Sequence, residues 1–377
     1  MKLATTFAGL VFGLAVTTAQ AEIVVGITIS TTGPAASLGI PEKNTIAMMP
    51  ATVGNEKIRY VLMDDGSDPS MAVKNARKLT AEDKADLLIG SSTVPTSLAL
   101  IEVAIETRTP MLALAPLAPA ADKRAWVFAP PQTNSLMASA VIEHMVSTGV
   151  KSMGFIGYND AFGEGFWREV EPLAQKAGIK ILASERYNRT DTSVTGQVLK
   201  LVSANPEAIL IVGSGTPAAL PQITLAERGY KGRVYQSHGA ANRDFLRVGG
   251  KNVEGAIIPV GPILVAEQLP DSHPSKKVAL GYVKAYEATH GADSRSTFGG
   301  HTWDAGLLFQ HAAQEALKKA KPGTPEFRQA LRDGLENVKN LAATHGVFNM
   351  SAADHTGLDI NSRVLIRVEG GNWKLVK

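Results

Sequence analysis

The stretch LLIGSSTVPTS, residues 87–97, joins a short apolar run to a hydroxyl-rich turn and then to a helix that begins near a proline. The run at 87–89 is typical of a buried strand, and residues 95–106 are typical of a helix. The same alternation recurs on both sides of this stretch. Further strands are predicted at residues 23–29, 58–63, 111–114, 153–158, 179–183, 208–212 and 233–236. Because no hairpin signal separates neighbouring strands, the pattern predicts an α/β fold with parallel sheets covered by helices on both faces.

The alternation is interrupted near residue 120 by a proline-rich stretch, residues 116–131. Such a stretch is typical of a crossing between domains. Two doubly wound parallel-sheet lobes, joined by a hinge of several crossings, are therefore expected. The predicted N-terminal lobe comprises residues 22–121 and 261–335, and the predicted C-terminal lobe comprises residues 122–260 and 336–377.

The first 21 residues are predicted to be a secretory signal peptide. Lys2 precedes a mostly apolar stretch at 3–16, and Ala19-Gln20-Ala21 is a small-x-small cleavage pattern. Cleavage after Ala21 would place the mature protein in a periplasm. The chain has no cysteine, so it offers no disulfide and no acceptor for a lipoprotein anchor.

Composition and motifs argue against several other classes of protein. The net charge is only +3 and no dense basic run occurs, so binding to nucleic acid or to a membrane surface is not expected. The eight histidines show no H-E-x-x-H spacing, which leaves a zinc site unsupported. The chain has no G-x-S-x-G nucleophile motif, and Gly213-x-Gly215 lacks the acidic residue of a dinucleotide site further along. We therefore expect no metal, no cofactor and no enzyme activity.

Open parallel sheets bind ligands at the carboxyl ends of their strands, so the turns that follow the strands are candidate binding segments. The hydroxyl-rich turn contains Ser91, Ser92 and Thr93. Two interpretations are open for it. Ser92 or Thr93 could cap the following helix while the other hydroxyls hydrate the turn. Alternatively, the hydroxyls and backbone N–H groups could hold an anion, such as a carboxylate, at the start of the helix.

Aromatic and imidazole side chains lie in or near other predicted turns. Phe162 follows the strand at 153–158 and could stack on a ligand or pack within its own lobe. His238 and His301 each lie near an expected edge of the cleft between the lobes.

Taken together, these segments resemble the periplasmic solute-binding proteins of ABC importers, in the branched-chain amino-acid receptor family with the type I fold. The resemblance covers the whole mature chain and rests on VGITISTTGPAASLG, DDGSDPSMAVKNARKL, LLIGSSTVPTS, YNDAFGEGF, FGGHTWDAGLL and GVFNMSAADHTGLD. It implies a ligand held between two lobes that close like a hinge. It also implies that Ser91, Ser92 and Thr93 hold the carboxylate of that ligand.

Two positions depart from the amino-acid receptors of this family. Leu117 stands where the resemblance implies a threonine, and His238 stands where it implies a glutamate that neutralises the α-ammonium group. Burying an ammonium group without a carboxylate partner is unfavourable. The sequence therefore favours an aromatic acid over an amino acid, with its apolar body against Leu117, Phe162 and Trp303 and its polar tip at His238 or His301.

The expected function is a monomeric transport receptor that binds a small carboxylate and docks on the membrane permease of an ABC importer. A benzoate or phenylpropanoid derivative is the favoured ligand; amino acids and aliphatic or keto acids are alternatives. An exported hydrolase and the input module of a sensor are more distant alternatives. The predicted ligand-binding residues are Ser91, Ser92, Thr93, Ala115, Leu117, Phe162, Gly213, His238, His301 and Trp303.

Overall fold

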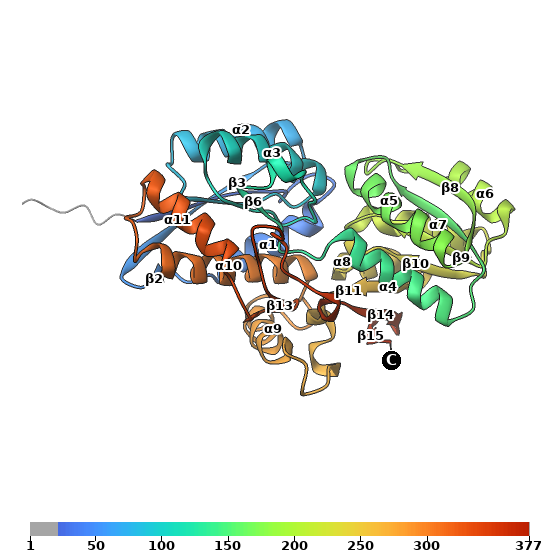
Figure 1. Cartoon of the computed structure of the whole chain (residues 1–377). Helices are drawn as coiled ribbons and strands as arrows, with labels where there is room; N and C mark the ends of the chain where they lie inside the picture. Colours follow the sequence, from blue (N-terminus) through green and yellow to red (C-terminus); the bar gives the residue numbers. More distant parts are fainter. Residues whose placement is uncertain (1–21, 377) are drawn as a thin grey trace, which may run out of the picture.

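The computed structural model describes residues 22–376, which form two lobes that are each built around an open β-sheet (Figure 1). The expected signal peptide, residues 1–21, lies outside the described residues. The first sheet has the strand order β2-β3-β1-β4-β5-β6. Its strands are β1 (Ile23–Ile29), β2 (Thr52–Val53), β3 (Glu56–Asp64), β4 (Leu87–Gly90), β5 (Met111–Leu112) and β6 (Val127–Phe128). Its strands pair in parallel, except that β2 is antiparallel to β3.

The second sheet has the order β15-β14-β11-β10-β9-β7-β8. Its strands are β7 (Ser152–Tyr158), β8 (Lys180–Tyr187), β9 (Ala208–Val212), β10 (Arg233–Gln236), β11 (Ile257–Val260), β14 (Val364–Glu369) and β15 (Asn372–Leu375). The strands from β7 to β11 pair in parallel, whereas β14 and β15 are antiparallel to their neighbours. A separate hairpin pairs β12 (Leu341–Ala342) with β13 (Val347–Phe348). The two-sheet α/β architecture predicted from the sequence is confirmed.

Helices pack against the faces of both sheets. They are α1 (Ala36–Ile46), α2 (Pro69–Ala81), α3 (Val94–Thr107), α4 (Asn134–Ser147), α5 (Ala161–Lys176), α6 (Thr195–Ala204), α7 (Ala219–Glu227), α8 (Arg243–Gly249), α9 (Lys276–His290), α10 (Thr297–Ala316) and α11 (Pro325–Glu336). Local sequence explains where α2 begins, since the Asp68 side chain accepts a hydrogen bond from the Met71 N–H at 2.8 Å and Pro69 follows at once. Among residues 22–376, no helix is long and apolar enough to cross a membrane.

The first lobe extends beyond the boundaries expected from the sequence. β6 lies in the stretch assigned above to the C-terminal lobe (122–260), yet it pairs with β5 in the first sheet, with Val127 beside Met111. The sequence also assigns residues 336–377 to the C-terminal lobe. However, Phe348 and Met350 are buried in the core of the first lobe beside Phe309 of α10. These apolar contacts place the segment up to β13, and the loop that follows it, in the first lobe.

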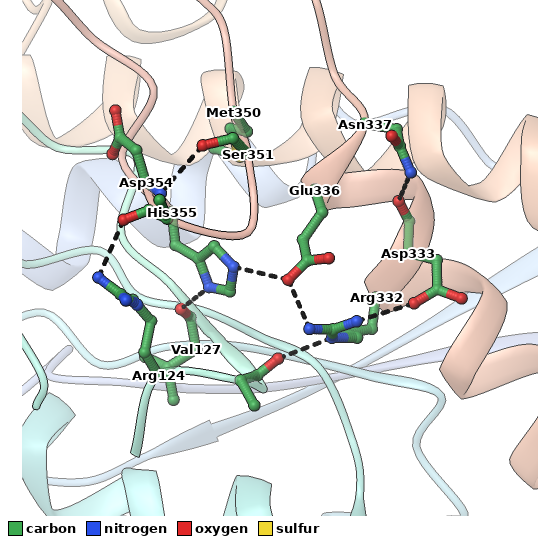
Figure 2. A network of polar contacts seen from close by, with 12 residues as sticks. Arg124, Val127, Arg332, Asp333, Glu336, Asn337, Met350, Ser351, Asp354 and His355 are labelled. Atoms are coloured by element: carbon green, nitrogen blue, oxygen red, sulfur yellow. Dashed lines mark hydrogen bonds and ion pairs between the residues drawn. The ribbon is translucent and has the colours of Figure 1, made fainter. Parts of the chain in front are cut away.

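His355 shows how tightly this loop is held to the first lobe (Figure 2). Its ring stacks on Phe128 of β6, with centroids 4.1 Å apart. Its Nδ1 lies 2.9 Å from the Val127 carbonyl oxygen, and its Nε2 lies 3.0 Å from Glu336 Oε1 at the end of α11. Arg332 pairs with the same carboxylate. One imidazole therefore joins β6, α11 and the loop after β13.

Helix α9 departs from the expected boundary in the opposite direction. It falls within residues 261–335, which the sequence assigns to the N-terminal lobe. Tyr282 and Tyr286 of α9 are nevertheless buried in one cluster with Phe245 of α8 and Ile366 of β14, both in the second lobe. The chain therefore crosses between the lobes after β6, between α9 and α10, and between β13 and β14.

Candidate ligand-binding site

A small cavity lies between the two lobes. Much of its lining comes from residues at or just beyond the carboxyl ends of strands, which is where open α/β sheets bind ligands. The N-terminal turns of α1 and α10 add further side chains. The lining residues are Leu38, Ser92, Thr93, Val94, Leu114, Ala115, Pro116, Phe162, Arg189, Ser214, His238, Gly239, Phe298 and His301.

Much of the cavity wall is apolar and comes from both lobes. Leu38 and Phe298 pack together in a small cluster with Ala35. Phe162 lies edge-on to His238, with ring centroids 5.6 Å apart and an interplanar angle of 87°. An aromatic ligand would meet ring faces and edges that pack favourably with it.

In the hydroxyl-rich turn after β4, the serine hydroxyls form hydrogen bonds with buried side chains of the first lobe. The Ser91 hydroxyl donates to Asp65 Oδ2 at 2.6 Å, and the Ser92 hydroxyl donates to Glu42 Oε2. Thr93 is the N-cap of α3 and forms a capping box with Thr96. The capping interpretation is therefore confirmed for Thr93. The hydroxyls of Ser91 and Ser92 bind two buried carboxylates behind the turn.

Both buried carboxylates are enclosed by protein. Asp65 also accepts hydrogen bonds from Ser30 Oγ at 2.7 Å and the Ser67 N–H at 3.0 Å. Burial raises the pKa of Glu42 well above its usual value, and the nearby Asp65 charge acts in the same direction, whereas the hydrogen bond from Ser92 opposes it. In the described part of the chain, Glu42 Oε1 has no hydrogen-bond partner. On the first-lobe side of the cavity, the acidic side chains of Asp65 and Glu42 therefore lie directly behind the lining turn.

Two histidines line the cavity and are held neutral by burial. Burial lowers the pKa of His238 to about 4. Burial, followed by the nearby His345 and His238, lowers the pKa of His301 well below its usual value. The Nδ1 atoms of both rings have no hydrogen-bond partner among residues 22–376. Each ring can therefore offer a neutral donor or acceptor to a ligand, according to its tautomer.

Arg189 brings a permanent positive charge to the cavity. It follows β8, and its Nε donates to Asp160 Oδ2 at 2.6 Å while its Nη1 donates to Ser214 Oγ at 2.7 Å. Its guanidinium carbon lies 4.2 Å from the centre of the Tyr158 ring. The sequence interpretation missed this residue. Arg189 follows the end of β8, and this position in a turn after a strand could have identified it as a candidate binding residue.

The structure brings most of the predicted site residues together. Ser92, Thr93, Ala115, Phe162, His238 and His301 all line the cavity. Ser91 instead binds Asp65 behind the turn, and Leu117 packs in the apolar core. The Gly213 carbonyl accepts a hydrogen bond from Ser237 Oγ at 2.7 Å, and the Trp303 ring is tilted against Tyr282 with ring centroids 5.4 Å apart. These four residues lie outside the cavity lining, so the prediction that they contact the ligand directly is not supported by their positions.

The sequence pattern of residues 22–370 matches the model of a protein family described as periplasmic binding protein. This chain belongs to that family. The two-lobed α/β architecture is the type I fold of these binding proteins, as the resemblance implied.

Solved and curated relatives agree with this assignment. An extracellular ligand-binding receptor from Rhodopseudomonas palustris HaA2 is 46% identical, with a TM-score of 0.93 over 94% of this chain and 100% of that chain. An amino acid binding protein from Pseudomonas aeruginosa is 25% identical over 67% of this chain and 70% of its own length. An R. palustris ABC-transporter solute binding protein in complex with benzoate is 19% identical, with a TM-score of 0.79 over 94% and 95% of the two chains. This last likeness shows the fold alone.

In this periplasmic binding protein, the cavity connects directly to the segments that join the lobes. His301 stacks on His345 with ring centroids 4.1 Å apart, and its Nε2 lies 3.3 Å from Gln132 Oε1. Gln132 follows β6 and donates to the Ser362 carbonyl oxygen at 2.8 Å. Asp304 accepts hydrogen bonds from the N–H groups of Thr344 and His345 at 2.8 and 3.0 Å. A buried polar network therefore joins the cavity to the hinge.

Proposed function

We propose that this protein is a monomeric periplasmic receptor of an ABC importer, which binds a small aromatic carboxylate between its lobes and presents it to a membrane permease. Benzoate or phenylpropanoid derivatives are the proposed ligand class. The expected signal peptide, cleaved after Ala21, supports a periplasmic location.

The observation that carries this proposal is the chemistry of the cavity lining. None of the lining residues is Asp or Glu, whereas Arg189 supplies a guanidinium and Phe162 and Phe298 supply rings. An α-amino acid would bury its ammonium group here without a carboxylate partner, which is unfavourable. A ligand with one anionic group and an apolar body fits this set of side chains better.

We propose Ser92, Thr93, Ala115, Phe162, His238 and His301 as ligand-contacting residues, together with Arg189. A ligand that contacts both lobes favours their closed arrangement over the open one, because it binds the closed state more tightly. The permease would then recognise the closed form. The benzoate complex of the R. palustris protein supports the idea that this fold can hold an aromatic acid.

A receptor for amino acids is the second candidate, because the P. aeruginosa relative is described as an amino acid binding protein. A hydrolase has less support. The Ser92 hydroxyl already donates to Glu42, and Ser214 Oγ accepts a hydrogen bond from Arg189. In the described part of the chain, neither serine has a hydrogen bond to a histidine that could act as its general base.

A thermal-shift panel on residues 22–377 tests the proposal, after unfolding and refolding to remove carried-over ligand. The panel contains benzoates, hydroxycinnamates, keto acids, aliphatic dicarboxylates and branched-chain amino acids. A ligand at 100 times its Kd adds about 2.7 kcal/mol to the free energy of unfolding, which raises Tm by a few degrees. We expect aromatic acids to raise Tm. A shift with leucine or valine alone would instead identify an amino-acid receptor.

A further inference from the structure

Arg189 is held in one orientation before any ligand arrives. Its side chain is only 17% exposed, and Asp160, Ser214 and the Tyr158 ring contact it on separate sides. In the described part of the chain, its Nη2 atom donates no hydrogen bond. A lining arginine, held beside the lining Ser214 hydroxyl, thus offers a free donor to a ligand.

Asp160 neutralises only part of the positive potential at this end of the cavity. Its Oδ1 also caps α5, where it accepts hydrogen bonds from the N–H groups of Phe162 and Gly163 at 2.8 and 3.1 Å. The positive end of the α5 dipole therefore lies beside the guanidinium. A carboxylate that approached Nη2 would meet this combined field.

In the hydroxyl-rich turn of the first lobe, by contrast, most hydrogen-bond donors already have partners within the protein. The hydroxyl protons of Ser91 and Ser92 already point at Asp65 and Glu42. The N–H groups of Ser91, Ser92 and Thr93 already donate to Ser97 Oγ, Ser91 Oγ and Thr96 Oγ1. A carboxylate placed there would find few free donors and would approach the Asp65 carboxylate, an unfavourable like-charge arrangement.

We propose that the carboxylate of the ligand is anchored in the second lobe by Arg189 and Ser214, and that Ser92 and Thr93 of the first lobe contact the rest of the molecule. This inference rests on the proposed function, because it assumes a carboxylate ligand in this cavity. It makes Arg189 the residue that selects acids over neutral analogues. The guanidinium keeps its charge at any physiological pH, so selection for the anion needs no protonated histidine.

The test compares acids with their amides by isothermal titration calorimetry. The probes are benzoate and cinnamate against benzamide and cinnamamide, followed by each further acid of the panel against its amide. The variants are Arg189→Gln, Arg189→Lys and Ser92→Ala. Arg186→Gln is the matched control, because Arg186 lies near the end of β8, just before the turn with Arg189, but pairs with Glu164 and lies over the Trp167 ring outside the cavity.

In the wild type, we expect acids to bind more tightly than their amides. Arg189→Gln should weaken binding of the acid about 10- to 100-fold, as expected for a lost charge-assisted hydrogen bond, and should leave amide binding almost unchanged. Arg189→Lys should lose less, because it keeps the charge. Ser92→Ala and Arg186→Gln should retain the preference for the acid. Thermal melts of each variant report separately on folding.

The outcomes separate the two proposals. If aromatic acids bind and Arg189→Gln keeps the preference for acids, the anchor is overturned and the proposed function stands. Loss of the preference in Ser92→Ala instead of Arg189→Gln overturns the anchor as well. If only non-aromatic acids bind and Arg189→Gln removes their preference over amides, the anchor stands and the aromatic ligand is rejected. If no carboxylate binds the wild type, both proposals are rejected.

Discussion

The backbone N–H of Thr216 in the second lobe donates a hydrogen bond to the Oγ of Ser37 in the first lobe, at 3.3 Å. This contact is possible because the preceding residue is Gly215, which has a φ of +64°. A Cβ on Gly215 would lie 2.5 Å from Ser37 Oγ and 2.9 Å from Leu38 Cδ1. The two lobes therefore approach each other closely at a glycine, beside the cavity.

Gly215→Ala should weaken ligand binding about tenfold or more, because the added methyl group keeps the lobes from approaching in the closed arrangement. Calorimetric titration with a panel ligand measures this loss. Gly229→Ala is the control, since Gly229 also has a positive φ of +73° but has no atom near its Cβ position. Equal affinity in the two variants would show that the Gly215 contact has no part in closure.

Ser91→Ala should lower the free energy of unfolding by about 1–3 kcal/mol, because it removes a hydrogen bond to the buried Asp65 carboxylate. Ligand affinity should change less than about threefold, which is under 1 kcal/mol, since Ser91 lies outside the cavity lining. Urea unfolding and calorimetric titration give the two values. Ser193→Ala, at an exposed serine, is the control for stability. Loss of binding without loss of stability would restore Ser91 to the ligand site.

The stability of the free protein should fall as pH decreases from 6.5 toward 4, partly through His238. Its pKa is about 4 in the folded protein and near 6.5 when unfolded, so the unfolded chain takes up the proton first. This single group should contribute about 2 kcal/mol of the loss between pH 7 and pH 5. His301 acts in the same direction.

His238→Leu isolates that contribution, because leucine keeps an apolar side chain beside Phe162 and Phe166 without a titrating group. Urea unfolding of both proteins at pH 7 and pH 5 gives the comparison. The variant should lose less stability on acidification than the wild type does. An identical loss in both proteins would mean that His238 does not titrate differently on folding.

Asp304→Asn should destabilise the hinge by about 3 kcal/mol, because an amide nitrogen would replace an oxygen that accepts hydrogen bonds from His345. Thermal unfolding should show a Tm several degrees lower. Asp333→Asn, at a partly exposed carboxylate on α11, serves as the control and should change Tm little. Equal Tm values for the two variants would contradict a structural role for the hinge network.

Much of the fold was predictable from local patterns. Residues 23–29 are a continuous apolar run and form β1 with the predicted bounds. Helix α4 was missed although Thr133 caps it by accepting a hydrogen bond from the Leu136 N–H, because the neighbouring prolines indicated only a crossing. The lobe to which α9 belongs was not predictable, since that depends on contacts of Tyr282 and Tyr286 with residues distant in sequence.

The site was predictable in its position and less so in its chemistry. The turns after the strands indicated where Phe162 and His238 would lie, because the carboxyl ends of parallel strands share an edge. The use of the hydroxyls at 91–93 depended on Glu42 and Asp65, which reach the turn only in the folded chain. The orientation of Arg189 was not predictable for the same reason, since Asp160 and Ser214 hold its guanidinium only in the folded chain.

The division of the first lobe along the chain has a consequence for its biosynthesis. Ile23, Val25 and Ile27 on one face of β1 are made early by the ribosome, but α10, α11 and Phe348, which bury them, are made near the end of translation. The core of the second lobe is likewise incomplete until β14 has been synthesised, because Ile366 and Val368 of β14 are part of it. Domains often fold during synthesis in order from the N-terminus. Here neither lobe can complete its core in that way, so a nascent chain stalled before residue 300 would expose apolar sheet faces to chaperones.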